Sequence, residues 1–253
     1  MKRKYLIVGN WKMNTDLDQA VELAGKIGKG LDRDDAQTVL CPPHVFIEQV
    51  FKAVKKVRKK NLAVGAQNIS WEKKGAYTGD ISIDMVKPWA KYAIIGHSER
   101  RHYFAETNAL INTKIKLALT NKITPILCVG EKRFMSSDLR DLGRDLIEGL
   151  DGLTKAEMKK VVVAYEPVWA IGTGKAALPN YVNKILKEMR LWLKDEKGFD
   201  VAEGVRMLYG GSVNSKNAKD YLQEEQVDGL LIGGASLKPG TFLRIVKAVP
   251  KDK

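Results

Sequence analysis

Eight short apolar runs rich in β-branched residues alternate with longer amphipathic patterns along the whole chain. The runs are Tyr5–Gly9, Thr38–Cys41, Leu62–Ala66, Tyr92–Gly96, Ile123–Val129, Val161–Tyr165, Val205–Tyr209 and Leu230–Ile232. Most begin about 25–40 residues apart, a spacing that suits successive β-α-β units. Two helical faces between the runs are Leu17, Ala20, Val21, Ala24 and Ile27, and Val182, Ile185, Met189 and Leu193 after Pro179. The alternation predicts an α/β protein with a parallel sheet.

Such a pattern fits either a doubly wound sheet or a closed (β/α)8 barrel. A chain of 253 residues has the usual size of one such barrel. No Gly-x-Gly-x-x-Gly motif follows the first run, and no linker-like stretch or composition shift divides the chain. We therefore expect a single-domain (β/α)8 barrel over residues 1–253, with eight parallel strands inside a ring of helices.

The balance of charge is strongly basic. Lys and Arg number 43 against 30 Asp and Glu, a formal net charge of +13, which favours anionic partners from phosphate esters to nucleic acid. The densest basic run, Lys55–Lys60, ends an amphipathic helical pattern, where cations complement the negative end of the helix dipole. Because no aromatic residues for base stacking are interleaved with it, we interpret the run as a solvated helix end and expect no nucleic-acid partner.

Only two cysteines are present, Cys41 and Cys128, and both end apolar runs far apart in the sequence. They form neither a disulfide framework nor a zinc-binding spacing, so we expect buried thiols in a reducing compartment. The apolar run after the basic start is too short for a signal peptide, and no stretch approaches the length of a membrane span. The sequence thus predicts a soluble, cytoplasmic protein that does not contact a membrane.

Glu166 stands at the end of the sixth apolar run, and in either architecture the carboxyl ends of the strands carry the chemistry. Pro167 biases Glu166 away from helical backbone, so its carboxylate is held on extended chain. The following segment, 167–177, combines the bulky Val168, Trp169 and Ile171 with Gly172 and Gly174. This combination is typical of a base that a small substrate reaches and a lid then covers.

Polar residues also follow the first and fourth runs. Asn10 and Lys12 come after the first, and His97 after the fourth. Ser98 is expected to cap the next helix, and a helix N-terminus beside an imidazole disfavours its protonation. We therefore expect His97 to be a neutral ring that donates a hydrogen bond.

Glycine pairs follow the last two runs, Gly210–Gly211 before Ser212 and Gly233–Gly234 after Ile232. Either pair alone is explained by a tight turn. Two pairs after the seventh and eighth strands of a barrel are typical of a site that grips phosphate with backbone amides. Enzymes of many reactions share such a site, so it does not identify one.

Together these groups fit one kind of chemistry. Glu166 is placed to remove a carbon-bound proton beside a carbonyl, while His97 and Lys12, with Asn10, stabilise the oxyanion of the enediolate that forms. Returning the proton to the neighbouring carbon interconverts an aldose and a ketose. The sequence carries no motif for a metal, nicotinamide or pyridoxal site, so we expect no cofactor.

Five segments, taken in order, resemble the motifs of the triosephosphate isomerase family along nearly the whole chain. They are Gly9–Asn14, Gly96–Arg101, Ala164–Gly174, Tyr209–Ser212 and Gly233–Ser236. The resemblance implies the TIM-barrel fold and the cofactor-free interconversion of dihydroxyacetone phosphate and D-glyceraldehyde 3-phosphate through an enediolate.

The resemblance also implies roles for individual residues. Glu166 is the base, His97 the neutral electrophile, and Lys12 and Asn10 bind substrate and stabilise the enediolate; Glu99 lies near the site in a structural or proton-relay role. The residues expected to meet the phosphate are Gly172, Ser212, Gly233 and Gly234. Those expected to press on the base when the lid closes are Ile171 and Leu231, and the resulting desolvation should make it a stronger base.

A long polar stretch, Asn68–Ile81, follows the third run, and long loops in compact domains are often functional. The resemblance implies a homodimer in which Tyr77 and Thr78 of this stretch insert beside the neighbouring subunit's site. A loop that packs on its own helices or is merely flexible is the alternative.

Two other functions compete with this one. A phosphate-binding barrel isomerase acting on a different sugar would share the glycine pairs, but it would not be expected to combine Lys12, His97 and Glu166 with this lid. A catalytically inactive barrel that binds anionic partners would suit the net charge of +13. Such a barrel should lose its base or its lid first, and both are present, so we favour the isomerase.

Overall fold

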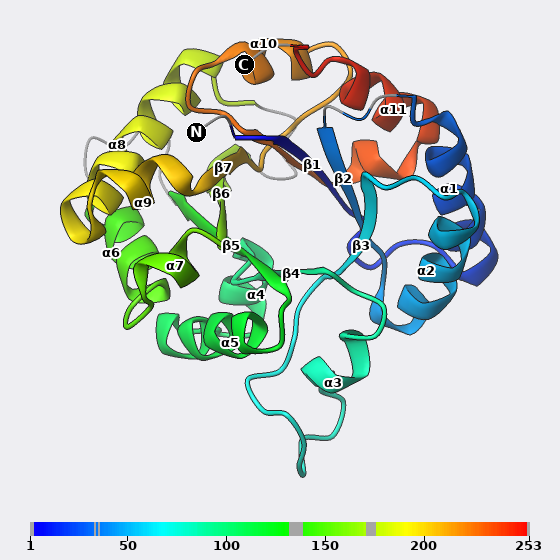
Figure 1. Cartoon of the computed structure of the whole chain (residues 1–253), viewed down its shortest axis with the longest axis horizontal. Coiled ribbons are helices and arrows are strands. Elements are labelled where there is room, and N and C mark those ends of the chain that lie inside the picture. The colour runs from blue at the N-terminus through cyan, green and yellow to red at the C-terminus, as the bar shows by residue number, and fades with distance from the viewer. Residues whose placement is uncertain (1–2, 33, 35, 132–138, 171–175, 252–253) are drawn as a thin grey trace.

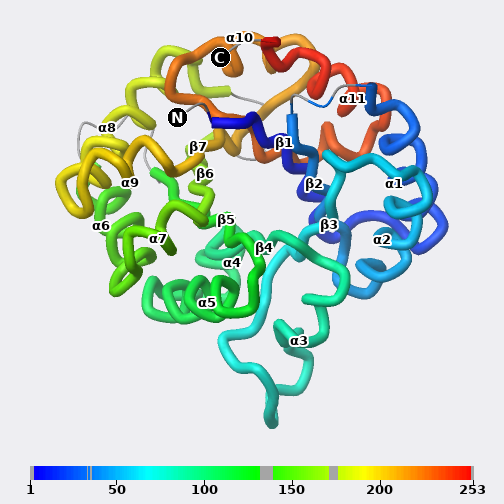
Figure 2. The backbone as a smooth tube through the Cα atoms, viewed as in Figure 1, coloured from blue at the N-terminus to red at the C-terminus, as the bar shows by residue number. Residues whose placement is uncertain are grey.

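The computed structural model describes residues 3–32, 34, 36–131, 139–170 and 176–251. Within these residues eight strands form a closed parallel barrel in sequence order, and helices surround it as an outer ring (Figure 1). The expected (β/α)8 TIM barrel is confirmed, and the doubly wound sheet is excluded because β1 pairs with both β2 and β8. Figure 2 follows the chain around this ring until its last strand lies beside its first.

All eight predicted runs coincide with strands. These are β1 (Tyr5–Asn10), β2 (Ala36–Cys41), β3 (Leu62–Ala66), β4 (Tyr92–Ile95), β5 (Thr124–Glu131), β6 (Val162–Pro167), β7 (Arg206–Tyr209) and β8 (Gly229–Ile232). In register, Val8 of β1 lies opposite Val39 of β2 and Leu231 of β8. Because the strands are parallel and start together, their carboxyl ends meet at one rim of the barrel.

Helices connect the strands and cover the outside of the barrel. The α-helices are α1 (Leu17–Gly30), α2 (Ile47–Lys56), α3 (Ile83–Val86), α4 (Ser98–Tyr103), α5 (Asn108–Thr120), α6 (Arg140–Gly149), α7 (Lys155–Met158), α8 (Pro179–Lys197), α9 (Phe199–Gly204), α10 (Ala218–Gln223) and α11 (Pro239–Lys247). Short 3₁₀ turns are η1 (His44–Phe46), η2 (Val168–Ala170) and η3 (Gly234–Leu237). Pro179 occupies the first turn of α8, as predicted.

The first helix shows where the sequence prediction was partly wrong. Its start is fixed by a capping box between Asp16 and Gln19. The predicted apolar face included Leu17 and Val21, but these side chains are exposed, and Leu23 is buried instead. The buried stripe is rotated from the predicted one because it must face the barrel.

Side chains alternate along each strand between the barrel interior and the surrounding helices. On β1, Leu6 and Val8 fill the interior, whereas Tyr5 and Ile7 join the core between strands and helices. Both cysteines are free and buried in the interior cluster, as expected. Within the described residues, no helix combines the length and the apolar character needed to cross a bilayer.

The segment between β3 and α3 extends away from the barrel (Figures 1 and 2). Its tip, residues 72–79, is exposed. This segment contains Tyr77 and Thr78, both of which lie outside the cavity described below.

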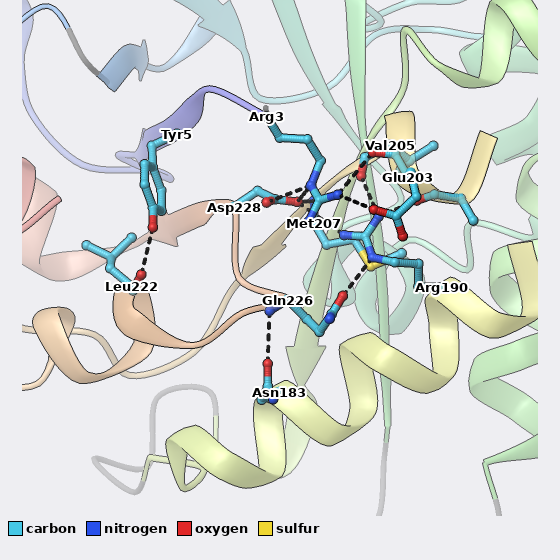
Figure 3. Close-up of polar contacts among 11 residues, drawn as sticks. Arg3, Tyr5, Asn183, Arg190, Glu203, Val205, Met207, Leu222, Gln226 and Asp228 are labelled. Carbon is cyan, nitrogen blue, oxygen red and sulfur yellow. Dashed lines mark hydrogen bonds and ion pairs between the residues drawn. The ribbon is translucent and has the colours of Figure 1, made fainter. Parts of the chain in front are cut away.

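At the amino ends of the strands, two arginines enclose one buried carboxylate (Figure 3). Asp228 has no exposed surface and accepts hydrogen bonds from Arg3 Nε at 2.9 and 3.0 Å and from Arg190 Nη2 at 3.3 Å. The backbone N–H of Met207 donates to the same carboxylate at 2.9 Å. Burial and the nearby Arg3 lower the pKa of Arg190, and Asp228 partly offsets this. The carboxylate therefore compensates two charges that are held side by side.

The next residue, Gly229, adopts a φ of +153° and begins β8. A Cβ at this position would lie 1.9 Å from the carbonyl oxygen of Leu6 on β1. Only glycine fits here, because the barrel closes between these two strands.

We expect Asp228→Asn to lower the free energy of unfolding by about 3–5 kcal/mol, because it leaves buried guanidinium groups without their counter-charge. Chemical denaturation of the purified variant measures this loss. Asp200→Asn is the control, since its exposed ion pair with Lys159 at 2.8 Å should contribute little. Equal midpoints for the two variants would contradict the central role of Asp228.

Candidate active site

A cavity of about 350 Å³ opens at the rim formed by the carboxyl ends of the strands. Eight of the predicted site residues line it: Asn10, Lys12, His97, Glu166, Ser212, Leu231, Gly233 and Gly234. Glu99 joins them through an ion pair with Lys12. Ile171 and Gly172 lie outside the described residues.

Glu166 is the most deeply buried carboxylate of this site, with 2% of its surface exposed. Its Oε1 atom lies 2.9 Å from His97 Nε2, and its Oε2 atom accepts a hydrogen bond from the backbone N–H of Ser98 at 2.9 Å. Both carboxylate oxygens are therefore bound to groups at the end of β4 and the start of α4. In this arrangement the Glu166 carboxylate rests against its neighbours and has little contact with solvent.

Two opposing effects set the pKa of Glu166. Burial raises it, but attraction to His97, the hydrogen bonds from His97 and Ser98, and the charge of Lys12 together hold it below its usual value. The expectation that desolvation by a closed lid strengthens this base stays a prediction, and in the conformation seen here the pKa of Glu166 is lowered. The physical reason is that each oxygen keeps a hydrogen-bond donor inside the protein.

His97, and not Ser98 as predicted, is the N-cap of α4. Its Nδ1 atom accepts a hydrogen bond from the backbone N–H of Glu99 at 3.2 Å. With Nδ1 accepting, the proton of a neutral ring lies on Nε2, which donates to Glu166. The predicted contact between the His97 ring and the N-terminus of the next helix, α4, is therefore present.

The charge state of His97 depends on a second contact. Burial, the largest single effect, lowers its pKa, but the attraction and the hydrogen bond to Glu166 together with the charge of Glu99 raise the pKa above the usual value. The hydrogen bond at Nδ1 opposes protonation, because a proton there would face the N–H of Glu99. This hydrogen bond, burial and the charge of Lys12 favour the neutral form expected from the sequence, whereas Glu166 and Glu99 favour the protonated one.

Lys12 has a strained backbone, with a φ of +54° that non-glycine residues seldom adopt. Its N–H donates to Asn10 Oδ1 at 3.1 Å, and its carbonyl accepts from Gln67 Nε2 at 2.8 Å. The side chain lines the cavity and its Nζ lies 2.6 Å from Glu99 Oε1. These contacts fix an ammonium group at the mouth of the barrel.

Glycine occupies the two pairs, Gly210–Gly211 and Gly233–Gly234, for different structural reasons. A Cβ on Gly210 would lie 3.1 Å from Glu166 Cγ, and one on Gly211 would lie 2.2 Å from the hydroxyl of Tyr209. A Cβ on Gly234 would meet nothing within 4 Å, so Gly233–Gly234 leaves an open cavity wall at the start of η3. Glycine is needed in the first pair because the side chains of Glu166 and Tyr209 lie so close to it. The interpretation of this pair as a phosphate-binding turn did not include that reason.

Ser212 and Leu231 complete the described wall. Ser212 Oγ donates to the carbonyl of Ala170 at 3.2 Å and so joins the end of β7 to the segment after Glu166. Leu231 is 4% exposed on β8, and its Cβ would lie 3.6 Å from a Cβ on Gly210. The apolar side of the cavity therefore lies close to Glu166.

Three contributors were missed in the sequence. Gln67 holds the strained Lys12 backbone, and Ser98 binds the base through its N–H rather than capping a helix with its side chain. Glu131, 5% exposed at the end of β5, accepts hydrogen bonds from Trp169 Nε1 at 2.7 Å and from the hydroxyl of Tyr181 at 2.8 Å. Gln67 directly follows β3, and Glu131 ends β5. A polar residue at the carboxyl end of a strand was the sequence signal that could have identified both.

Comparison with known proteins shows the family to which a chain with this geometry is similar. The family model described as triosephosphate isomerase matches residues 5–249. A triosephosphate isomerase from Dictyoglomus thermophilum is 42% identical over 255 residues, which covers 98% of this chain and 100% of the relative. The one from Alkaliphilus oremlandii is 41% identical over 248 residues, covering 96% of this chain and 99% of the relative.

A third relative, the triosephosphate isomerase of Caldanaerobacter subterraneus subsp. tengcongensis, is 42% identical over 252 residues. It is matched over 96% of this chain and 99% of its own length. The similarity thus extends over the whole barrel and is not confined to the rim. On this match and on the arrangement of the site, the chain belongs to the triosephosphate isomerase family.

Proposed function

We propose that this chain interconverts dihydroxyacetone phosphate and D-glyceraldehyde 3-phosphate through an enediolate, with Glu166 as the base. The names of its relatives support the reaction. The observation that carries the assignment of roles is the 2.9 Å contact between Glu166 and His97 in a cavity that Lys12 also lines.

The reaction begins when Glu166 leaves Ser98 and turns toward the substrate carbon. Its lowered pKa keeps the carboxylate ionised at neutral pH, so it is ready to accept a proton. The C–H bond breaks, its proton moves to the carboxylate, and its electron pair forms the C=C bond of the enediolate. The same carboxylate then returns the proton to the neighbouring carbon, while His97 gives its Nε2 proton to one substrate oxygen and takes the hydroxyl proton from the other, so that the carbonyl and the hydroxyl exchange places.

His97 and Lys12 stabilise the charge that develops on the substrate oxygens. The Nε2–H of the neutral imidazole becomes free to donate once Glu166 moves, and the Lys12 ammonium adds a fixed positive charge. Asn10, 6% exposed, holds the backbone of Lys12 and lines the same wall. Glu99 sets the position of the ammonium through their ion pair.

The phosphate of the substrate occupies the wall made by Ser212 and Gly233–Gly234, where the backbone lies open. In this proposal Gly172 completes the grip from the 167–177 segment, which closes as a lid. Closure brings Ile171 and Leu231 against the base and excludes water from the intermediate.

We propose that the active form is a homodimer. Three apolar side chains are exposed: Met13 next to Lys12 at 96%, Val45 on η1 at 74% and Met85 on α3 at 62%. Exposed apolar surface of this kind marks an interaction site. A second copy of the chain, inserting Tyr77 and Thr78 from its projecting segment, would cover it.

We also place the protein in the cytoplasm, as one domain over residues 1–253 without a nucleic-acid or membrane partner. The two buried free cysteines support a reducing compartment. Burial raises the pKa of both thiols, which keeps them unreactive.

Glu166→Gln should fold like the wild type and lose about 10³-fold or more in kcat, because an amide cannot accept the proton. A coupled assay of both directions measures this loss. Glu225→Gln, an exposed change on the far side of β8, is the control and should keep full activity. Near-normal turnover by Glu166→Gln would contradict the assignment of Glu166 as the base.

His97→Gln should raise the pKa of Glu166, since burial remains while the attraction to the imidazole is lost. Carboxyl ¹³C NMR of labelled protein follows this titration directly. In the wild type the folded-state pKa lies below the unfolded one, so ionised Glu166 stabilises the fold above its unfolded pKa, and this contribution is lost as the pH falls through the folded pKa. The exposed His102→Gln is the matched control on α4, and an unchanged Glu166 pKa in His97→Gln argues against the coupling.

Thr78→Arg should weaken the homodimer, because it places a charge on the segment expected to insert into the partner. Sedimentation velocity over a range of concentrations should show a shift toward monomer. Thr120→Arg adds the same charge at the exposed end of α5 and should leave the mass unchanged. If both variants sediment alike, the projecting segment is not the interface.

A further inference from the structure

Positively charged side chains gather at the amino ends of strands β3 to β6, on the face of the barrel opposite the active-site cavity. Arg58 and Lys60 precede β3, Lys91 precedes β4, Lys122 precedes β5 and Lys160 precedes β6. All five side chains are exposed. We call these five residues the basic rim.

The barrel topology makes neighbours of the loops that carry the basic rim. β3, β4, β5 and β6 are consecutive around the barrel (Figure 1). The backbone of Lys91 lies between the two flanking strands, since its N–H donates to the carbonyl of Val64 on β3 at 2.8 Å and its carbonyl accepts from the N–H of Thr124 on β5 at 2.9 Å. The basic rim is therefore one arc, although its members are far apart in the sequence.

Carboxylates do not neutralise this arc. Within the part of the chain that the structure describes, no member of the basic rim forms an ion pair, although the neighbouring Lys159 pairs with Asp200 at 2.8 Å. The loops on the other side of the same face are acidic, with Asp200 and Glu203 before β7 and Glu225 before β8. The amino-end face thus has a positive side and a negative side.

Two members of the basic rim occupy backbone positions that favour glycine. Arg58 has a φ of +54° and Lys122 a φ of +60°, and each lies one residue beyond the C-cap of its helix, α2 or α5. This position is usually glycine, because a Cβ is strained in left-handed backbone. The helix dipole does not account for Arg58, since Lys55 and Lys56 already supply cations to the last turn of α2. The strain therefore points to a role for these charges outside the fold itself.

The side chains indicate the chemistry of the partner. Four of the five are lysines, whose ammonium groups attract carboxylates without a fixed geometry, whereas the phosphates of nucleic acids are typically held by the planar fork of arginine. Phe51 on α2 and Trp89 just before Lys91 are half-buried and pack on each other with ring centroids 5.5 Å apart, so they are poorly placed to stack on bases. These features favour a carboxylate-rich polypeptide over a nucleic acid.

The shape of the basic rim indicates an extended occupant. The rim follows the starts of four adjacent strands, and three strand spacings amount to about 15 Å. An extended chain covers that distance with about five residues. A short run of aspartates or glutamates is therefore long enough to contact every member of the rim.

We propose that the basic rim binds an extended acidic segment of a partner protein. The active-site cavity opens at the carboxyl ends of the strands, so a partner at their amino ends leaves the path of the substrate open. The homodimer proposed above also leaves the rim free, because its projecting segment follows the carboxyl end of β3. The inference goes beyond the isomerase reaction and does not depend on it.

Arg58→Gly combined with Lys122→Gly tests this role. The double variant removes two charges and also relieves the backbone strain, so we expect it to be at least as stable to heat as the wild type. Its affinity for a fluorescein-labelled decaglutamate peptide, measured by fluorescence anisotropy at about 0.1 M NaCl, should fall about fivefold. Thermal unfolding of the same samples shows that the loss does not come from misfolding.

Lys184→Gln combined with Lys187→Gln is the matched control. It removes the same net charge from two exposed residues of α8, in the half of that helix nearer the active-site end. We expect less than about a twofold change in affinity. Equal losses in the two double variants would overturn the proposal, because the peptide would then respond to net charge alone. A wild-type Kd weaker than about 1 mM would overturn it as well.

Lysine acetylation of the wild type locates the bound peptide without any substitution. Decaglutamate should protect Lys60, Lys91, Lys122 and Lys160 from acetylation, as mass spectrometry of the digest shows, and should leave Lys184 as reactive as before. Protection spread evenly over these lysines would contradict a site at the basic rim.

Two other anionic probes test the class of partner. An oligouridylate RNA and phosphatidylserine vesicles are added to the decaglutamate complex at equal concentrations of negative charge. We expect neither to displace half of the peptide. Displacement by either one, with protection of the same lysines, would overturn the assignment to an acidic polypeptide.

Discussion

Closure of the parallel sheet is the constraint on which the rest of this structure depends. Because β1 pairs with β2 on one side and β8 on the other, all eight carboxyl ends must share one rim. Residues as distant in sequence as Asn10, His97 and Glu166 thereby meet in a single cavity. The same closure brings the Leu6 carbonyl so near β8 that only glycine fits at 229. The barrel topology thus determines the position of the site, and the individual side chains determine what the site can do.

The two ends of the barrel hold buried carboxylates in contrasting ways. Asp228 is enclosed by two arginines and a backbone N–H, and nothing in that arrangement can be exchanged without leaving a buried charge unpaired. Glu166 accepts hydrogen bonds from a backbone N–H and an imidazole, and a substrate oxygen or a water can take the place of the carboxylate on both donors. The first carboxylate holds the fold together, while the second is able to move.

The strands and the position of Glu166 were predictable because local signals agree on them. β-branched runs mark the strands, and Pro167 fixes the backbone after the base. The contact between Ser98 and Glu166 spans 68 residues and depends on how β4 and β6 are placed around the barrel, which no local pattern encodes. The lowered pKa of Glu166 in this conformation could not be predicted for the same reason. The burial was foreseeable, but the donors that outweigh it come from another strand.

The resting position of Glu166 has an energetic consequence for the reaction. In the proposed reaction the carboxylate gives up hydrogen bonds that now lower its pKa in order to reach the substrate, and its basicity rises as it does so. That exchange is unfavourable by itself, so binding energy from elsewhere must drive it. The phosphate is the part of the substrate best able to supply this energy, since it does not react and meets an open backbone wall at Gly233–Gly234. Ser212 of the same wall donates to the carbonyl of Ala170, so phosphate binding there would also act on the chain just after Glu166.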